Sequence, residues 1–397
     1  MKKLFAFITF IVITFILNIS VGALEIDLID TNTESNTTIG RSTTAEKSAI
    51  IDILNFVALD KDTIGLEDVD FSQLKIGNKI YRYILTESGF EVSSYSYPIM
   101  YNENIVLMAT SLNDKFQITT YEAELLEDSG LDQVALIYDS NGLYFYDGMT
   151  FELVHESSEH IEGRESIHDI TQTSSRILTP AISEIVLSDL NASENLFNDD
   201  PLISVASTSI DTYYAATVDF VSQNDMNTCW AACVAMLTNT LNNHNYSAEE
   251  IAIAYLGETA MENGLTLDHV STILRGEVNY TSIMDEDILE DCYCDEDYAY
   301  LTYTISDENI QWCMEDYRPI VGAFIRTGGN QGHHAVVIDA IYRSAGYIRV
   351  CDPNIGRIYS YRDTINEDQR YYGEYTYIHP DTEVLYYMVG QIATCNY

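Results

Sequence analysis

Basic residues are scarce in this chain of 397 residues, which has 19 Lys and Arg against 62 Asp and Glu. The formal net charge is therefore −43, and no lysine occurs after Lys115. An exterior of this sign repels nucleic acid and anionic polymers and attracts cationic partners. We therefore expect no nucleic-acid partner.

Long apolar runs are absent except at the start of the chain. Met1-Lys2-Lys3 is followed by an apolar stretch from Leu4 to Leu17 and by the small residues Val21-Gly22-Ala23. A basic start, a short apolar stretch and a small-residue end are typical of a secretory signal peptide, which we place at residues 1–23. Because no second long apolar run follows, we expect a secreted, extracellular protein with no membrane association after signal cleavage.

Cysteine is missing from the first 228 residues, and all seven cysteines lie further along: Cys229, Cys233, Cys292, Cys294, Cys313, Cys351 and Cys395. Neither Cys229/Cys233 nor Cys292/Cys294 has the spacing of a structural zinc site, so we expect no metal. If Cys229 is a free nucleophile, six cysteines remain, which is an even number compatible with disulfides in an oxidising compartment. Their pairing stays open.

The first part of the mature chain has the pattern of a small, strand-rich unit. A helical spacing of apolar residues covers 45–59, and short aromatic and β-branched runs with turn signals between them fill 76–154. We predict an N-terminal α+β domain over residues 24–156, which is also a candidate pro-region. Residues 157–210 are rich in Ser, Thr, Asn, Asp and Glu, and we interpret them as a polar linker with a candidate processing site.

Residues 211–397 change from helical to strand patterns along their length. Helices are expected over 228–241, from 248 to about 255, over 267–274 and over 307–316, with Ser247 to Glu250 as a capping box. Apolar runs of strand length follow at 319–325, 335–341, 347–351, 357–361 and 384–389. Helices first and an antiparallel sheet second predict an α+β domain.

Cys229 stands at the expected start of an apolar helix, with Gln223 six residues upstream. A helix N-terminus carries unpaired N–H groups and partial positive charge, which favour a thiolate. The Cys229 N–H and the Gln223 side-chain amide would then be two donors for a tetrahedral oxyanion. The alternative interpretation is a buried structural cysteine, since free cysteine is among the most buried residue types.

A thiol nucleophile needs a base, and His334 begins an expected strand. A hairpin turning near 343–346 pairs residues whose numbers sum to roughly 686–690, which places His334 across from Asp352 to Asn354. Asp352 is then a natural partner for the imidazole. The alternatives are a polar strand end for His334 and an ordinary Asp-Pro-Asn turn for Asp352.

Taken in order, these motifs resemble the papain-like cysteine peptidases, and within them the bacterial branch similar to the bacteriocin-processing, peptidase C39-like enzymes. The motifs are Gln223, Cys229-Trp230-Ala231-Ala232, Gly332-His333-His334-Ala335-Val336 and Cys351-Asp352-Pro353-Asn354. The resemblance implies Cys229 as nucleophile, His334 as general base and acid, Asp352 as its orienting residue and Gln223 as oxyanion donor. His334 is chosen over His333 because the family histidine directly precedes Ala-Val. Papain itself has asparagine as third member, so Asn354 stays open beside Asp352.

These expectations describe a secreted cysteine peptidase that hydrolyses peptide bonds in a peptide or protein substrate, needs no cofactor, and is a zymogen if residues 24–156 inhibit it. One alternative is a cell-wall amidase or acyltransferase that uses the same residues. A second alternative is an inactive secreted binding module with a peptidase-like fold.

Overall fold

The computed structural model of the protein describes residues 43–113, 115–156, 163–167, 213–224, 227–257, 264–278, 284–294, 299–303, 307–326, 333–343, 345–362 and 375–394. The predicted signal peptide, residues 1–23, lies outside these residues. No helix within the described ranges is long and apolar enough to cross a membrane.

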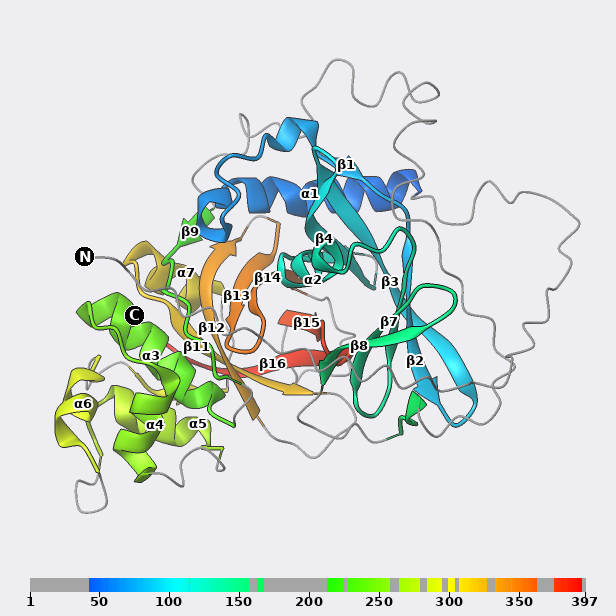
Figure 1. Ribbon diagram of the computed structural model, residues 1–397. Coiled ribbons are helices and arrows are strands. Elements are labelled where there is room, and N and C mark those ends of the chain that lie inside the picture. Colours follow the sequence, from blue (N-terminus) through cyan, green and yellow to red (C-terminus); the bar gives the residue numbers. More distant parts are fainter. Residues whose placement is uncertain are drawn as a thin grey trace, which may run out of the picture.

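Helices and strands are mixed along the chain, as predicted for an α+β protein. The helices are α1 (Thr44–Ala58), α2 (Tyr121–Ser129), α3 (Cys229–Asn242), α4 (Ala248–Leu256), α5 (Leu267–Leu274), α6 (Glu286–Asp291) and α7 (Asp307–Glu315), with short 3-10 helices η1 (Lys61–Ile64) and η2 (Phe71–Gln73). Figure 1 shows α3 to α6 gathered at one end of the molecule.

The N-terminal strands are β1 (Lys75–Ile76), β2 (Ile80–Thr86), β3 (Gly89–Tyr101), β4 (Asn104–Leu112), β5 (Lys115–Thr119), β6 (Ala135–Tyr138), β7 (Gly142–Tyr146) and β8 (Phe151–Glu156). The later strands are β9 (Tyr213–Ala215), β10 (Leu301–Thr302), β11 (Ile320–Arg326), β12 (His333–Tyr342), β13 (Tyr347–Asp352), β14 (Gly356–Arg362), β15 (Tyr375–His379) and β16 (Val384–Ile392). All these pairings are antiparallel except β2 with β6.

Six of the later strands close on themselves as a barrel. Strands β11 to β14 pair in sequence order, β15 pairs with both β14 and β16, and β16 returns to pair with β11. Closure leaves no free edge within this ring, which removes the exposed N–H and C=O groups that an open sheet would carry. His334 and Asp352 both lie on strands of this barrel, β12 and β13.

The strands of the predicted N-terminal domain continue the same sheet. Strand β5 pairs with β14 at Ile118 with Tyr359 and at Thr119 with Ile358, and β4, β3, β2, β6, β7 and β8 follow outward. Because the sheet runs through both parts of the chain, the structure does not confirm the predicted arrangement of two separate domains, and the boundaries at 24–156 and 211–397 stay predictions. Figure 1 shows the N-terminal strands beside the barrel.

The two parts also share a hydrophobic core. The Phe56 ring of α1 is fully buried and lies within 6.0 Å, between ring centroids, of Tyr213, Tyr342, Tyr347 and Tyr359. Burial of such a side chain contributes about 1.5–3 kcal/mol. The helix expected at 45–59 therefore forms, and its Phe56 side chain packs against tyrosines of the barrel strands.

Buried charges join the same two parts. Arg349 of β13 is fully buried and forms ion pairs with Asp60, which follows α1, and with Asp339 of β12 at 2.6 Å. The Tyr359 hydroxyl donates to Asp60 at 3.1 Å. Burial raises the pKa of Asp339 to about 7.

Only residues 163–167 of the predicted linker, 157–210, are described. These residues are attached to the N-terminal strands, because the Glu165 N–H donates to the Leu85 carbonyl at 3.0 Å and the Ser140 N–H donates to the Glu165 carbonyl at 3.0 Å. The candidate processing site in the rest of the linker lies outside the described residues.

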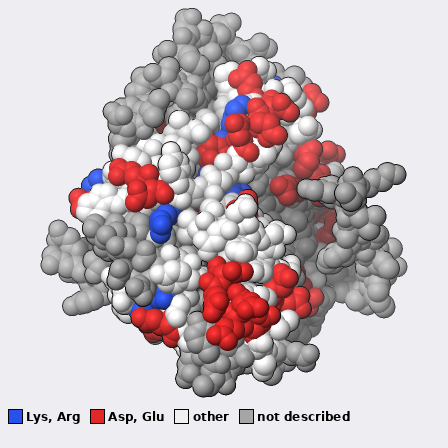
Figure 2. Space-filling view, turned by 90° about the vertical axis from the view of Figure 1, so that its left-hand side faces the viewer, with Lys and Arg blue, Asp and Glu red and all other residues white. Residues whose placement is uncertain are grey.

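The acidic composition is visible on the surface. Figure 2 shows Asp and Glu gathered in several patches, with few Lys or Arg among them. Helices α4 and α6 contribute exposed carboxylates at Glu249, Glu250, Glu286, Asp287 and Glu290.

Candidate active site

Cys229 is the first residue of α3, one residue from its predicted helix start at Thr228. Thr228 has φ −113° and ψ 21°, which is not helical backbone, so the helix begins at the cysteine itself. The thiol thus lies beside the unpaired N–H groups of the first turn. The Cys229 side chain is only partly buried, whereas every residue from Trp230 to Asn239 is buried.

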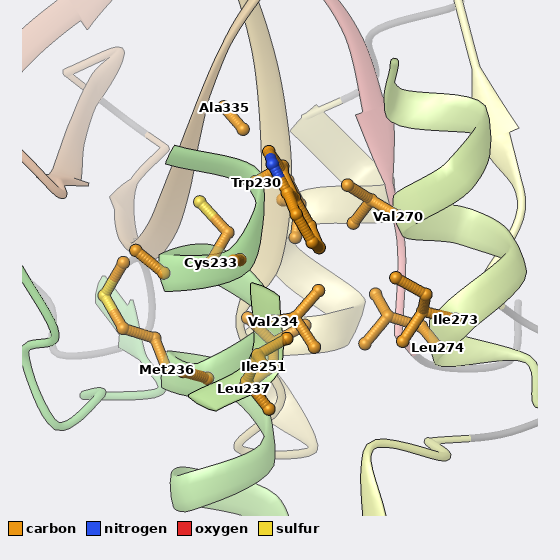
Figure 3. Packing of buried hydrophobic residues seen from close by; sticks show 14 of the residues in the cluster. Trp230, Cys233, Val234, Met236, Leu237, Ile251, Val270, Ile273, Leu274 and Ala335 are labelled. Carbon is orange, nitrogen blue, oxygen red and sulfur yellow. The ribbon is translucent and has the colours of Figure 1, made fainter. Parts of the chain in front are cut away.

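Packing of α3 fixes the position of the cysteine. Figure 3 shows Trp230 and Val234 facing the α5 residues Val270 and Ile273, with Ala335 of β12 near the start of α3. All these side chains belong to one core cluster and are at most 3 % exposed. A helix packed on this many sides cannot shift its N-terminus without opening the core.

His334 lies at the second position of β12, where it pairs with Phe324 of β11. Its Nε2 is 3.0 Å from Oδ2 of Asp352, and its side chain is 12 % exposed. Since Nε2 is engaged by the carboxylate, Nδ1 is the ring nitrogen available to the thiol.

Asp352 ends β13 and is completely buried. Besides His334, it accepts from the Tyr377 hydroxyl at 2.8 Å and from the Asn354 N–H at 2.9 Å. Burial opposes its charge, but the charge and hydrogen bond of His334 and the Asn354 N–H outweigh burial and hold the pKa of Asp352 well below the usual range. The carboxylate is therefore ionised and points at the imidazole.

The hairpin between β12 and β13 has the predicted geometry. Val337 pairs with Cys351 and Tyr342 with Tyr347, so the paired numbers sum to 688 or 689 on the two sides of an irregularity between Ile338 and Ala340. The turn falls at 343–346 as expected. Of the two residues left open beside His334, Asp352 makes the side-chain contact, and Asn354 is exposed and contributes its backbone N–H.

His334 also interacts with Cys229. Burial lowers the pKa of His334, but Asp352 raises it by charge and by hydrogen bond, and Cys229 adds a side-chain hydrogen bond, so that the pKa lies well above its ordinary value. The helical side of the molecule thus supplies the sulfur, and the barrel supplies the imidazole and the carboxylate. Such a chain of contacts suits nucleophilic attack followed by proton donation.

Gln223 is tied to the same site through its backbone. Its N–H donates to the carbonyl of Pro353 at 3.1 Å, next to Asp352, and its own carbonyl accepts from the Thr228 hydroxyl at 3.2 Å. The residue therefore bridges the end of β13 and the start of α3. All four predicted site residues converge on one region.

Three ring residues near His334 were not found by the sequence reasoning. They are Tyr377 and His379 of β15 and Tyr386 of β16, and the Tyr386 and His379 ring centroids lie 5.6 and 6.4 Å from that of His334. Burial lowers the pKa of His379 to about 4, so that this ring is neutral at pH 7. The alternating run Tyr375-Thr376-Tyr377-Ile378-His379 was a strand signal that would have indicated β15.

The other cysteines have different surroundings. Cys233, Cys292, Cys294 and Cys351 form no disulfide, so the pairings that the even count allowed do not occur at these four positions. Burial raises the pKa of Cys233 and of Cys351, which makes these thiols poor nucleophiles. Within the part of the chain that the structure describes, no group of three His, Cys, Asp or Glu side chains has metal-binding geometry.

Comparison with known proteins agrees with the motifs. Residues 215–381 match the family model described as Peptidase_C39 like family, which confirms the resemblance stated from the sequence. A solved structure titled as a study of antibody cross reactivity between the mite allergens Blo t 1 and Der p 1 is 13% identical, covering 46% of this chain and 72% of that chain at a TM-score of 0.27. A likeness this distant carries no argument here. No curated protein matches the chain significantly in sequence.

Proposed function

We propose that this chain, whose residues 215–381 belong to the Peptidase C39-like family, hydrolyses peptide bonds with Cys229 as nucleophile. The observation that carries the proposal is the continuous contact from Cys229 through His334 to the buried carboxylate of Asp352. Each member of that contact comes from a different element, α3, β12 and β13.

The reaction begins with attack of the Cys229 thiolate on the scissile carbonyl carbon, forming a C–S bond and an oxyanion. The Cys229 N–H and the Gln223 side-chain amide stabilise this oxyanion. Collapse of the intermediate breaks the C–N bond, and protonated His334 gives its proton to the leaving amine. Neutral His334 then takes a proton from water, whose oxygen attacks the thioester carbon; the C–S bond breaks, the acid leaves, and the Cys229 thiolate and protonated His334 are restored.

Asp352 keeps the imidazole ring oriented and stabilises its protonated form. His379 is neutral at pH 7, so it does not compete as a cation for the same carboxylate. We propose a peptide or protein substrate, export through the segment 1–23, and an extracellular place of action.

The test compares wild type with Cys229→Ala on casein. We expect hydrolysis to fall by on the order of 10³-fold or more, since residues that act as a unit are lost together. The matched control is Cys294→Ala, because Cys294 is also a partly buried cysteine without a disulfide, and its Sγ donates to the Cys292 carbonyl. Its activity should stay within two-fold of wild type.

Purified peptidoglycan serves as the second substrate. Release of fragments from peptidoglycan with no hydrolysis of casein would favour the amidase alternative. Hydrolysis of casein by Cys229→Ala at the wild-type rate would refute Cys229 as the nucleophile.

A further inference from the structure

The hairpin formed by β15 and β16 lies against the His334–Asp352 pair. Tyr377 of β15 donates its hydroxyl to Asp352 at 2.8 Å, and its ring stacks on Tyr386 of β16 at 5.4 Å between centroids. Tyr386 in turn lies 5.6 Å from the His334 ring. This hairpin therefore contacts both members of the pair.

The turn of the hairpin, residues 380–383, is held by the N-terminal strands. Arg82 of β2 donates through Nε to Glu383 at 2.6 Å, and Ser93 and Ser94 of β3 donate their hydroxyls to the other carboxylate oxygen. Glu383 has φ +51°, a conformation that is uncommon for a residue with a side chain, so the turn depends on such contacts to keep its shape.

Two more residues, from the N-terminal strands β5 and β8, contact the same hairpin. The side-chain amide of Gln117 in β5 both donates to the Ile378 carbonyl and accepts from the Ile378 N–H, each at 2.7 Å. His155 of β8 lies 3.4 Å from the carboxylate of Asp381. The hairpin is thus contacted by residues of β2, β3, β5 and β8. These contacts fall at Ile378, before His379 in the chain, and at Asp381 and Glu383, after it.

The charges at this junction are buried and shared. Arg82 is fully buried and pairs with Glu122 of α2 as well as with Glu383. An arginine between two carboxylates keeps one partner when the other is neutralised. Replacement of Glu383 by glutamine therefore removes the charge of that side chain and leaves Arg82 paired with Glu122.

We propose that Arg82, Gln117 and Glu383 are positioning residues for the His334–Asp352 pair, so that the N-terminal strands are a permanent, activating part of the catalytic site. The inference rests on the proposed function of Cys229 and His334. Under this inference the strands of residues 80–156 activate rather than inhibit, because their side chains hold the hairpin that contacts the catalytic pair. A small displacement of a catalytic group can cost on the order of 10²-fold in rate.

The experiment uses full-length Glu383→Gln and Gln117→Leu, with Asp60→Asn as matched control. Asp60 also joins the N-terminal part to the barrel through a buried ion pair, but its partner is Arg349 of β13, outside the hairpin. The readouts are the melting temperature, kcat and KM on a casein-derived peptide, and the pH dependence of iodoacetamide alkylation at Cys229, followed by mass spectrometry.

We expect Glu383→Gln and Gln117→Leu to lower kcat by ten-fold or more, with KM within two-fold, and to shift the pH dependence of alkylation. Asp60→Asn should lower the melting temperature and leave kcat and the alkylation profile within two-fold of wild type. If Glu383→Gln or Gln117→Leu folds and keeps the wild-type kcat and alkylation profile, the inference is overturned.

His334→Ala separates this inference from the proposed function. If His334→Ala keeps the wild-type alkylation profile, Cys229 and His334 are not a catalytic pair and the proposed function itself fails. If His334→Ala changes the profile while Glu383→Gln and Gln117→Leu do not, the pair stands and only the positioning role is refuted.

Discussion

Replacement of Asp352 by asparagine tests the charge at the centre of the site with little change of shape. The wild-type carboxylate accepts three hydrogen bonds, from His334, from the Tyr377 hydroxyl and from the Asn354 N–H. The asparagine carbonyl oxygen can occupy the place of Oδ2 and keep the hydrogen bonds from His334 and from the Tyr377 hydroxyl. The variant therefore loses the charge and the bond from Asn354.

The cost follows from the distance and the burial of the pair. Two opposite charges about 4 Å apart attract by about 4 kcal/mol at an effective dielectric constant near 20. The hydrogen bond to the asparagine carbonyl keeps part of this attraction. We therefore take about 3 kcal/mol as the stabilisation that the protonated imidazole loses. Because 1.36 kcal/mol is ten-fold, kcat/KM should fall on the order of 100-fold.

The same charge makes stability depend on pH. Asp352 raises the pKa of His334 above 6.5, so that contribution is fully present below pH 6.5 and is lost as the pH rises through the folded-state pKa. His334 lowers the pKa of Asp352 below 3.8, so the contribution is present above pH 3.8 and is lost as the pH falls through the folded-state pKa. Wild type should exceed Asp352→Asn in stability most between pH 3.8 and 6.5.

The assays are kcat/KM on a casein-derived peptide and the melting temperature measured from pH 3 to 9. Asn354→Ala is the matched control, because this exposed residue contacts Asp352 through a backbone N–H that alanine keeps. Its kcat/KM should stay within two-fold of wild type. An Asp352→Asn protein with wild-type kcat/KM and a constant melting-temperature difference across this pH range would refute the reasoning.

Two further predictions concern α3 and α4. Cys233→Ser places a hydroxyl in a fully buried site among apolar side chains and should lower the free energy of unfolding by about 1–3 kcal/mol, measured by urea denaturation, while the folded variant keeps wild-type kcat. Unchanged stability would contradict the buried position. Ser247→Ala removes the side-chain cap that accepts from the Glu250 N–H and should cost about 1 kcal/mol in the same assay, with Glu249→Ala, whose side chain is exposed, as the control. Equal stability of Ser247→Ala and wild type would refute the cap.

Local patterns were sufficient for most elements near the site. The helix expected at 267–274 has those bounds, and the one expected at 228–241 runs from Cys229 to Asn242, since apolar spacing and caps act within a few residues. The short hairpin turn after Tyr342 fixes the register of β12 on β13, so counting residues placed His334 across from the segment Asp352 to Asn354.

Other features had no local signal. The contact of Arg82 with Glu383 joins residues 301 positions apart, and the pairing of β5 with β14 joins strands whose sequences do not indicate a partner. The sheet that runs through both parts of the chain therefore does not confirm the predicted two-domain arrangement, which stays a prediction. The rings of Tyr377 and Tyr386 come beside His334 only because β15 closes the barrel.

The sequence by itself determined that Cys229 stands at a helix start, that His334 and Asp352 lie on one hairpin, and that residues 215–381 match the Peptidase_C39 like family model, because each depends on neighbours in the chain or on ordered motifs. Only the tertiary structure decided that Asp352 rather than Asn354 faces His334, and that Arg82, Gln117 and Glu383 brace the hairpin behind them. The physical reason is that closure of the barrel and its joining to the N-terminal strands depend on buried contacts between segments far apart in the chain, which no local pattern encodes.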